Sequence, residues 1–121
     1  MTLGNQYRFL GQVGHSLGEY ATALAAAYRL FDARVIIELL EYLGDSMEGL
    51  DRVREAKAYY DQALIEQEKF YGKEMMQTKP EIKIRRINLL SKQGDLAARS
   101  SDLVSAERFY RESLAFNMPG M

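Results

Sequence analysis

Carboxylates are the residues in this sequence whose types and spacing come closest to supporting chemistry. Glu38 and Glu41 form a Glu-x-x-Glu pair, which supplies half of a di-iron ligand set. The other half needs a Glu-x-x-His motif, and the single histidine, His15, does not complete one. The chain has no cysteine, which excludes thiol catalysis, disulfides and cysteine-based zinc sites. We therefore predict a protein that is not an enzyme and that binds no metal or cofactor.

A row of acids is the clearest charge pattern: Glu38, Glu41, Asp45 and Glu48. Their spacings of three, four and three residues put them on one helix face, over ~15 Å at 1.5 Å per residue. Like charges at such spacings destabilise an isolated helix by about 0.2–0.5 kcal/mol per pair. Such a row needs either neighbouring bases, for which Arg8 and Lys92 are candidates, or a ligand. The sequence leaves both alternatives open.

Bases gather further along the chain. Residues 73–92 hold six bases and two acids, whereas residues 37–72 hold nine acids and four bases. Lys79, Lys83 and Arg86 form a basic stripe at helical spacing. An RNA contact through this stripe is one hypothesis, but no aromatic residues alternate with the bases and only a few phosphates could be neutralised. The spacing favours a solvated face that pairs with acids of this or another chain.

Length and composition indicate one globular domain over residues 1–121. The chain is 47% hydrophobic and 27% charged, and its formal charge is −1, which excludes nucleic-acid binding driven by overall charge. The apolar stretch between Glu19 and Arg29 is far shorter than the about 20 residues that a membrane span needs. The first ten residues lack a signal-peptide pattern. We expect a cytoplasmic protein with no membrane insertion.

Helices are expected almost throughout, because only two prolines occur and apolar residues recur at steps of three and four. We predict six helices in three pairs, at about 4–17, 19–31, 33–48, 52–71, 79–98 and 102–116. Thr78 and Glu81 form a capping box for the fifth helix, with Pro80 in its first turn. Ser101 or Asp102 is expected to cap the sixth.

An internal repeat relates segments 39–64 and 89–114 at a constant offset of 50 residues. The identical pairs are Leu39/Leu89, Leu40/Leu90, Gly44/Gly94, Asp45/Asp95, Ala56/Ala106, Tyr60/Tyr110 and Leu64/Leu114. A glycine followed twelve residues later by an alanine occurs three times, as Gly11–Ala23, Gly44–Ala56 and Gly94–Ala106. Small residues let two helices approach closely, so the repeat predicts tandem helical hairpins.

This pattern resembles the tetratricopeptide repeat, a helix-turn-helix unit of about 34 residues. The second copy matches best, through Leu40, Leu43, Gly44, Met47, Val53, Ala56, Tyr60 and Ala63. The first copy keeps Tyr7, Leu10, Gly11, Tyr20 and Ala23, and the third keeps Leu90, Gly94, Ala97, Leu103, Ala106, Tyr110 and Ser113. The copies would cover about 4–36, 37–72 and 87–119, with an extended junction at about 69–84. The resemblance implies an all-α fold, a short right-handed superhelix of about six helices.

In that family the first helices of successive repeats line a concave groove that holds a segment of a partner protein. The corresponding positions here are Asn5, Arg8, Gln12, Glu38, Glu41, Asp45, Glu48, Asn88 and Lys92. The resemblance therefore implies a non-catalytic adaptor that binds a partner peptide or helix in the groove. The row of acids would give it a preference for basic and apolar ligands.

The last predicted helix suggests a second function. Its outer face would include Phe109 or Phe116, and no capping helix follows it. A second copy that covered this face would make the chain a homodimeric structural or regulatory subunit. The sequence does not decide between the adaptor and the self-assembling subunit.

Overall fold

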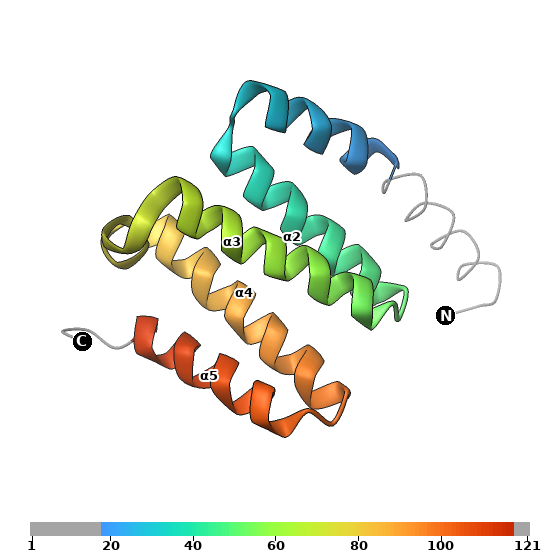
Figure 1. Ribbon diagram of the computed structural model, residues 1–121, viewed down its shortest axis with the longest axis vertical. Helices are drawn as coiled ribbons and strands as arrows, with labels where there is room; N and C mark the ends of the chain where they lie inside the picture. Colours follow the sequence, from blue (N-terminus) through green and yellow to red (C-terminus); the bar gives the residue numbers. More distant parts are fainter. Residues whose placement is uncertain (1–17, 118–121) are drawn as a thin grey trace.

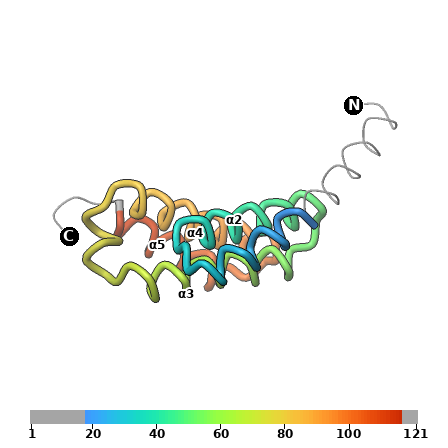
Figure 2. Tube along the Cα trace, turned by 90° about the horizontal axis from the view of Figure 1, so that it is seen from above, coloured from blue at the N-terminus to red at the C-terminus, as the bar shows by residue number. Residues whose placement is uncertain are grey.

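A computed structural model describes residues 18–117, which are helical apart from short turns. Residues 18–30 form a helical segment that precedes four further helices: α2 (Ala33–Gly49), α3 (Val53–Thr78), α4 (Pro80–Arg99) and α5 (Leu103–Asn117). The helices lie side by side in chain order (Figure 1). Figure 2 shows α2 and α4 on one side of the molecule and α3 on the other. None of the helices in residues 18–117 is long and apolar enough to cross a membrane.

The predicted all-α class is confirmed for the described residues, and most helix boundaries fall within two residues of the prediction. Helices predicted at 33–48, 79–98 and 102–116 are observed at 33–49, 80–99 and 103–117, and the one predicted at 19–31 ends at residue 30. The helix predicted at 4–17 lies outside the described residues. The one predicted at 52–71 continues to Thr78, because a second helical stretch follows a break at Gly72.

The junction between α3 and α4 depends on this break. Gly72 has φ 72° and ψ 171°, a conformation that glycine adopts without the steric cost that a Cβ would bring. The helical residues after it bury Met76 and lead to Lys79, which alone separates α3 from α4. The junction predicted at 69–84 is therefore helical on both sides of Gly72.

The capping box predicted at the start of α4 is wrong. Lys79 occupies the N-cap position, and Thr78 is the last residue of α3. The Thr78 hydroxyl donates to the Glu74 carbonyl at 2.8 Å, the back-bond that a helical threonine makes, and so it does not turn toward Glu81. Pro80 does stand in the first turn of α4, as predicted.

Three turns share one backbone device: a residue with left-handed φ followed by an amide that bonds back to the preceding helix. The left-handed residues are Phe31, Asp51 and Ser101, with φ of 55°, 60° and 61°. The bonds run from the amides of Asp32, Arg52 and Asp102 to the carbonyls of Ala27, Met47 and Ala97, at 3.1, 2.8 and 2.8 Å. This is the pattern of a Schellman C-cap. Asp102 also caps α5, accepting from the Ser105 amide at 3.2 Å, as predicted.

One close contact recurs fifty residues apart and joins α2 to α3 and α4 to α5. A Cβ on Gly44 would overlap the Tyr60 ring, and one on Gly94 would lie 2.5 Å from Cε1 of Tyr110. Each tyrosine hydroxyl donates to the aspartate that follows the glycine, at 2.5 Å and 2.6 Å. The glycines therefore let each pair of helices approach closely enough for the ring to reach that carboxylate.

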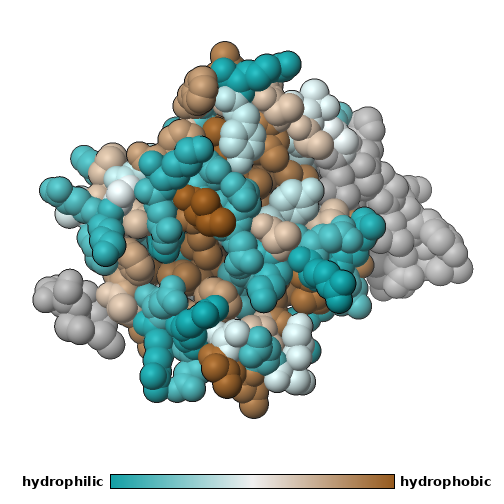
Figure 3. All heavy atoms as spheres, in the orientation of Figure 1, coloured by the Kyte–Doolittle hydropathy of each residue, from teal (hydrophilic) through white to brown (hydrophobic). Residues whose placement is uncertain are grey.

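The core runs through all the helices, and its end at α5 differs from the prediction. Phe109 is buried and Phe116 packs against the core, because α5 turns this face inward. The outward apolar residues are instead Leu103, Val104 and Leu114. Figure 3 shows hydrophobic atoms at the lower edge of the molecule, where Figure 1 places α5.

Replacing Gly44 with alanine should destabilise the protein, because the new methyl group would overlap the buried Tyr60 ring. Overpacking costs about 1–3 kcal/mol, which exceeds the about 1 kcal/mol of helix propensity gained. Gly94→Ala should cost less, because the Tyr110 ring is partly exposed and can move. Urea denaturation measures both. Gly49→Ala is the matched control, since its Cβ would meet open space among the described residues; an equal loss there would contradict the explanation.

Candidate functional site

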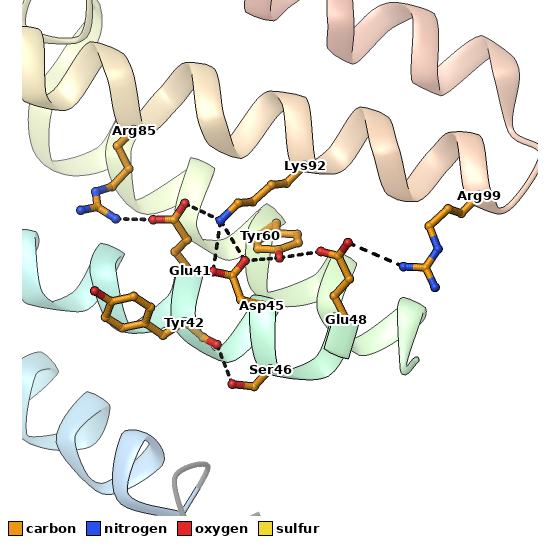
Figure 4. Close-up of polar contacts among 9 residues, drawn as sticks. All are labelled: Glu41, Tyr42, Asp45, Ser46, Glu48, Tyr60, Arg85, Lys92 and Arg99. Carbon is orange, nitrogen blue, oxygen red and sulfur yellow. Dashed lines mark hydrogen bonds and ion pairs between the residues drawn. The ribbon is translucent and has the colours of Figure 1, made fainter. Parts of the chain in front are cut away.

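Charged side chains of α2 and α4 face one another in a row between the two helices (Figure 4). The three bases of α4 are seven residues apart, which is two helical turns, so they share one face. Three acids of α2 project toward them. We call these six residues the charge ladder: Glu41, Asp45, Glu48, Arg85, Lys92 and Arg99.

Lys92 occupies the centre of the charge ladder. Its Nζ donates to Oε2 of Glu41 at 2.9 Å and to Oδ1 of Asp45 at 2.8 Å, and it lies 5.7 Å from the centre of the Tyr60 ring. Arg85 binds the other carboxylate oxygen of Glu41. Partial burial opposes the charge on Lys92, but the hydrogen bonds to Asp45 and Glu41 outweigh it and raise the pKa of Lys92. Glu41 is only 7% exposed, so its charge depends on these two partners.

Tyr60 reaches the ladder from α3. Its hydroxyl lies within hydrogen-bond distance of Asp45 at 2.5 Å and of Glu48 at 3.0 Å. Burial, with the adjoining carboxylates of Asp45 and Glu48, raises the pKa of Tyr60 well above its ordinary value. Arg99 closes the row, 3.6 Å from Glu48 and 2.7 Å from Asp51 in the following turn. The Tyr60 side chain thus connects α3 to two acids of α2.

Three of the four acids in the predicted row pair with bases of α4. Glu38 stays outside the ladder and accepts a hydrogen bond from the Tyr42 hydroxyl at 3.1 Å. The other three acids are neutralised by neighbouring bases, which is one of the two alternatives that the sequence left open. Lys92 was one of the bases predicted for this role.

Among the remaining predicted groove residues, the structure describes only Asn88, which does not join the ladder. Asn88 is exposed on α4, outside the row of bases. Three positions lie outside the described residues: Asn5, Arg8 and Gln12. Sequence reasoning missed Arg85 and Arg99, although their seven-residue spacing from Lys92 matches the spacing of Glu41 and Glu48. That shared period is the signal that could have found them.

The predicted basic stripe of Lys79, Lys83 and Arg86 does not form one exposed face. Arg86 is buried, and its guanidinium donates to the Leu64 carbonyl at 3.1 Å and to Glu68 at 2.8 Å. Lys79 is exposed and Lys83 is half-buried. The stripe fails because Arg86 turns toward α3. Arg86 does pair with an acid of this chain, Glu68, but it is buried and not part of the solvated face that was predicted.

Gln93 stands fifty residues after Leu43, so the internal repeat has a glutamine here in place of a leucine. It is buried, and its Nε2 donates to the Lys57 carbonyl at 3.3 Å and to the carboxylate of Asp61. Burial raises the pKa of Asp61, partly offset by Lys57 and Arg108. The glutamine therefore fixes α4 on α3 through polar contacts where a leucine would make only apolar ones.

An excess of acid and two aromatic rings lie beside the ladder. The three acids of the ladder, with Glu38 and Asp51 at its margin, make five carboxylates against three bases, which sum to a charge of −2. Tyr42 stacks on Tyr20 with ring centres 5.8 Å apart, on the side of α2 away from α4. We call the charge ladder together with Glu38, Tyr42 and Asp51 the α2–α4 surface.

A hollow of about 420 Å³ lies at one end of the α2–α4 surface. Its wall includes two bases, Arg34 and Arg85, and one acid, Glu81. Ile37, Ile84 and the Tyr71 ring line it from three different helices. Ile84 is exposed. The hollow offers an apolar contact next to the acids.

Comparison with protein-family models, curated proteins and solved structures finds no match to this chain. Its function therefore has to be inferred from the residues themselves.

Glu41→Gln should destabilise the protein, because it leaves Arg85 and half-buried Lys92 with one charged partner fewer. The expected loss is about 1–3 kcal/mol in urea denaturation. Glu112→Gln is the matched control, because its pair with Arg108 is exposed and 4.0 Å long, and such pairs contribute about 0–1 kcal/mol. Equal effects of the two substitutions would show that the ladder does not stabilise the fold.

Stability should fall as the pH rises above about 10. The pKa values of Tyr60 and Lys92 are higher in the folded state than their ordinary values of 10.0 and 10.5, which apply to the unfolded chain. Below these pKa values both residues contribute fully to stability. At higher pH the unfolded chain loses its protons first, so folding requires proton uptake and stability falls. Tyr60→Phe should flatten the decline in the denaturation midpoint between about pH 8 and 11. Tyr110→Phe, at an exposed position, should flatten it less.

Proposed function

We propose that this chain is a non-catalytic adaptor that binds a peptide or helix of a partner protein on the α2–α4 surface. The observation that carries the proposal is the excess of two negative charges that remains after the ladder is paired. Glu38 bonds to exposed Tyr42, Asp51 lies in the turn after α2, and the hollow lies at Arg85. Interfaces typically combine such aromatic contacts with complementary charge at the rim.

The proposal includes an architecture of tandem helical hairpins similar to tetratricopeptide repeats. Two observations support it. The Gly44–Tyr60 contact has a counterpart in Gly94–Tyr110, and the turn at Asp51 has one at Ser101. In the proposed repeats α2 and α4 are the first helices, which line the binding groove in that family. The α2–α4 surface would then be part of such a groove.

The ligand that fits best has basic residues with an apolar one between or beside them. Ladder carboxylates have lone pairs beyond those that Lys92 and Tyr60 use, and Asp45 and Glu48 are partly open to solvent. Glu38 and Glu48 are ten residues apart, about 15 Å along α2, and Asp51 follows in the next turn. An extended peptide covers about 15 Å with about five residues. The ligand is therefore expected to be a short segment, not a single side chain.

Selection of displayed random peptides against the purified chain tests the adaptor. Peptides with basic and apolar residues should be enriched. Their binding should weaken about tenfold in Glu38→Gln/Asp51→Asn, which removes two carboxylates at the margin of the ladder; Arg99 loses Asp51 and keeps Glu48 as its partner. Tyr42→Ala should weaken it as well.

The control is Glu55→Gln/Glu74→Gln, which removes the same charge from exposed positions on α3. Binding should not change in this variant. Peptides that bind all the variants equally, or a selection that enriches no peptide, would refute the adaptor on this surface.

A further inference from the structure

Apolar residues of α5 are exposed although their counterparts fifty residues earlier are covered. Tyr60 and Leu64 of α3 are 0% and 9% exposed, whereas Tyr110 and Leu114 of α5 are 38% and 54% exposed. Leu103 of α5 is 71% exposed. The helix that covers the earlier set is α4. We call the exposed set, with the adjoining carboxylate, the open edge: Asp95, Leu103, Tyr110 and Leu114.

The way in which α4 covers the first hairpin shows what such a surface binds. Lys92 lies over the Tyr60 ring and binds Asp45, the acid that the same ring contacts. Gln93, the next residue, binds Asp61 of α3. One lysine and its neighbour thus engage both helices of the hairpin.

Two leucines of α4 complete the cover. At 100° per residue, Leu89 and Leu96 lie on the arc between Lys92, which faces α2, and Gln93, which faces α3. Both leucines are buried. They therefore pack between α2 and α3. The residues through which α4 contacts this pair of helices follow the order Leu-x-x-Lys-Gln-x-x-Leu, from Leu89 to Leu96.

The open edge repeats this surface with defined changes. Tyr110 donates to Asp95 as Tyr60 does to Asp45, so a lysine above the Tyr110 ring would meet a carboxylate. Arg111 stands where Asp61 stands on α3, so an acid would suit the position of Gln93. Arg111 pairs with exposed Glu107, one helical turn away, and can exchange that partner.

We propose that the open edge binds an amphipathic helix of a partner protein with the pattern Leu-x-x-Lys-Glu-x-x-Leu. The lysine pairs with Asp95 over Tyr110, the glutamate pairs with Arg111, and the leucines cover Leu103 and Leu114. This site is separate from the α2–α4 surface, and it does not depend on the adaptor function proposed above.

The probe is a fluorescent peptide of residues 80–99 of this chain with Gln93→Glu, Arg85→Ala and Arg99→Ala. The two alanines replace Arg85 and Arg99, which pair with Glu41 and Glu48 in the fold. At the open edge the positions of those two acids are taken by Ser91 and Ala98, so the arginines would have no carboxylate there. Fluorescence anisotropy with the full chain should show saturable binding. The same peptide with Lys92→Glu should bind at least about tenfold more weakly, because the glutamate would face Asp95.

The matched protein variant is Leu103→Glu/Leu114→Glu. Both positions are exposed, so thermal unfolding should show an intact fold while peptide binding falls at least about tenfold. Glu38→Gln/Asp51→Asn should bind the probe normally, which separates this site from the α2–α4 surface.

Three outcomes would overturn the proposal. The first is no saturable binding to the full chain. The second is equal binding to the leucine variant, which would mean that the peptide replaces α4 in its own place or binds elsewhere. The third is a light-scattering mass near twice 13.9 kDa that falls to the monomer mass in the leucine variant, since a second copy of the chain would then occupy the open edge.

Discussion

Alongside the contacts that Gln93 and Arg86 make with α3, α4 is held against both α2 and α3 by one ammonium group, that of Lys92. Two carboxylates of α2 and one ring of α3 converge on it, so only one rotation of α4 satisfies all three. A turn of α4 by one residue would carry its row of bases away from α2 and leave buried Glu41 without them, at a large cost. The direction of α4 in turn determines where α5 packs and which of its residues stay outside. Both proposed binding surfaces therefore depend on this one contact.

The charge ladder contributes more to selecting one rotation of α4 than to the free energy of folding. Burying charged groups is costly, and apolar residues of similar volume often stabilise a core equally well or better. Apolar packing alone would hold α4 on α3 in several rotations, because the buried leucines of α4 are chemically alike. We infer that Glu41, Lys92 and the Tyr60 hydroxyl discriminate among these rotations, since each needs a partner at a defined place. The acids that remain at the rim can then serve recognition.

The helices could be predicted because their signals are local, whereas the ladder and the turns could not. Apolar periodicity and Pro80 predicted most of the described helix boundaries within two residues, but not the end of α3, which lies at Thr78 and not at residue 71. The partners of Arg85 and Arg99 lie 44 and 48 or more residues away, so spacing within one helix could show their shared face but not what it faces. Left-handed turn residues are usually glycine, and here Phe31 and Asp51 adopt that conformation. At Thr78 the capping motif was present, but α3 extends through it.

The difference between the two halves of the internal repeat also bears on how the stack of helices could lengthen. The bases of α4 meet three carboxylates of α2, but only Asp95 remains at the corresponding positions of α4, because Ser91 and Ala98 replace Glu41 and Glu48. A further helix identical to α4 added beside α4 and α5 would therefore bring two arginines to positions without a carboxylate, which is costly where they are buried. The row of paired charges therefore does not extend to a further copy of the repeat.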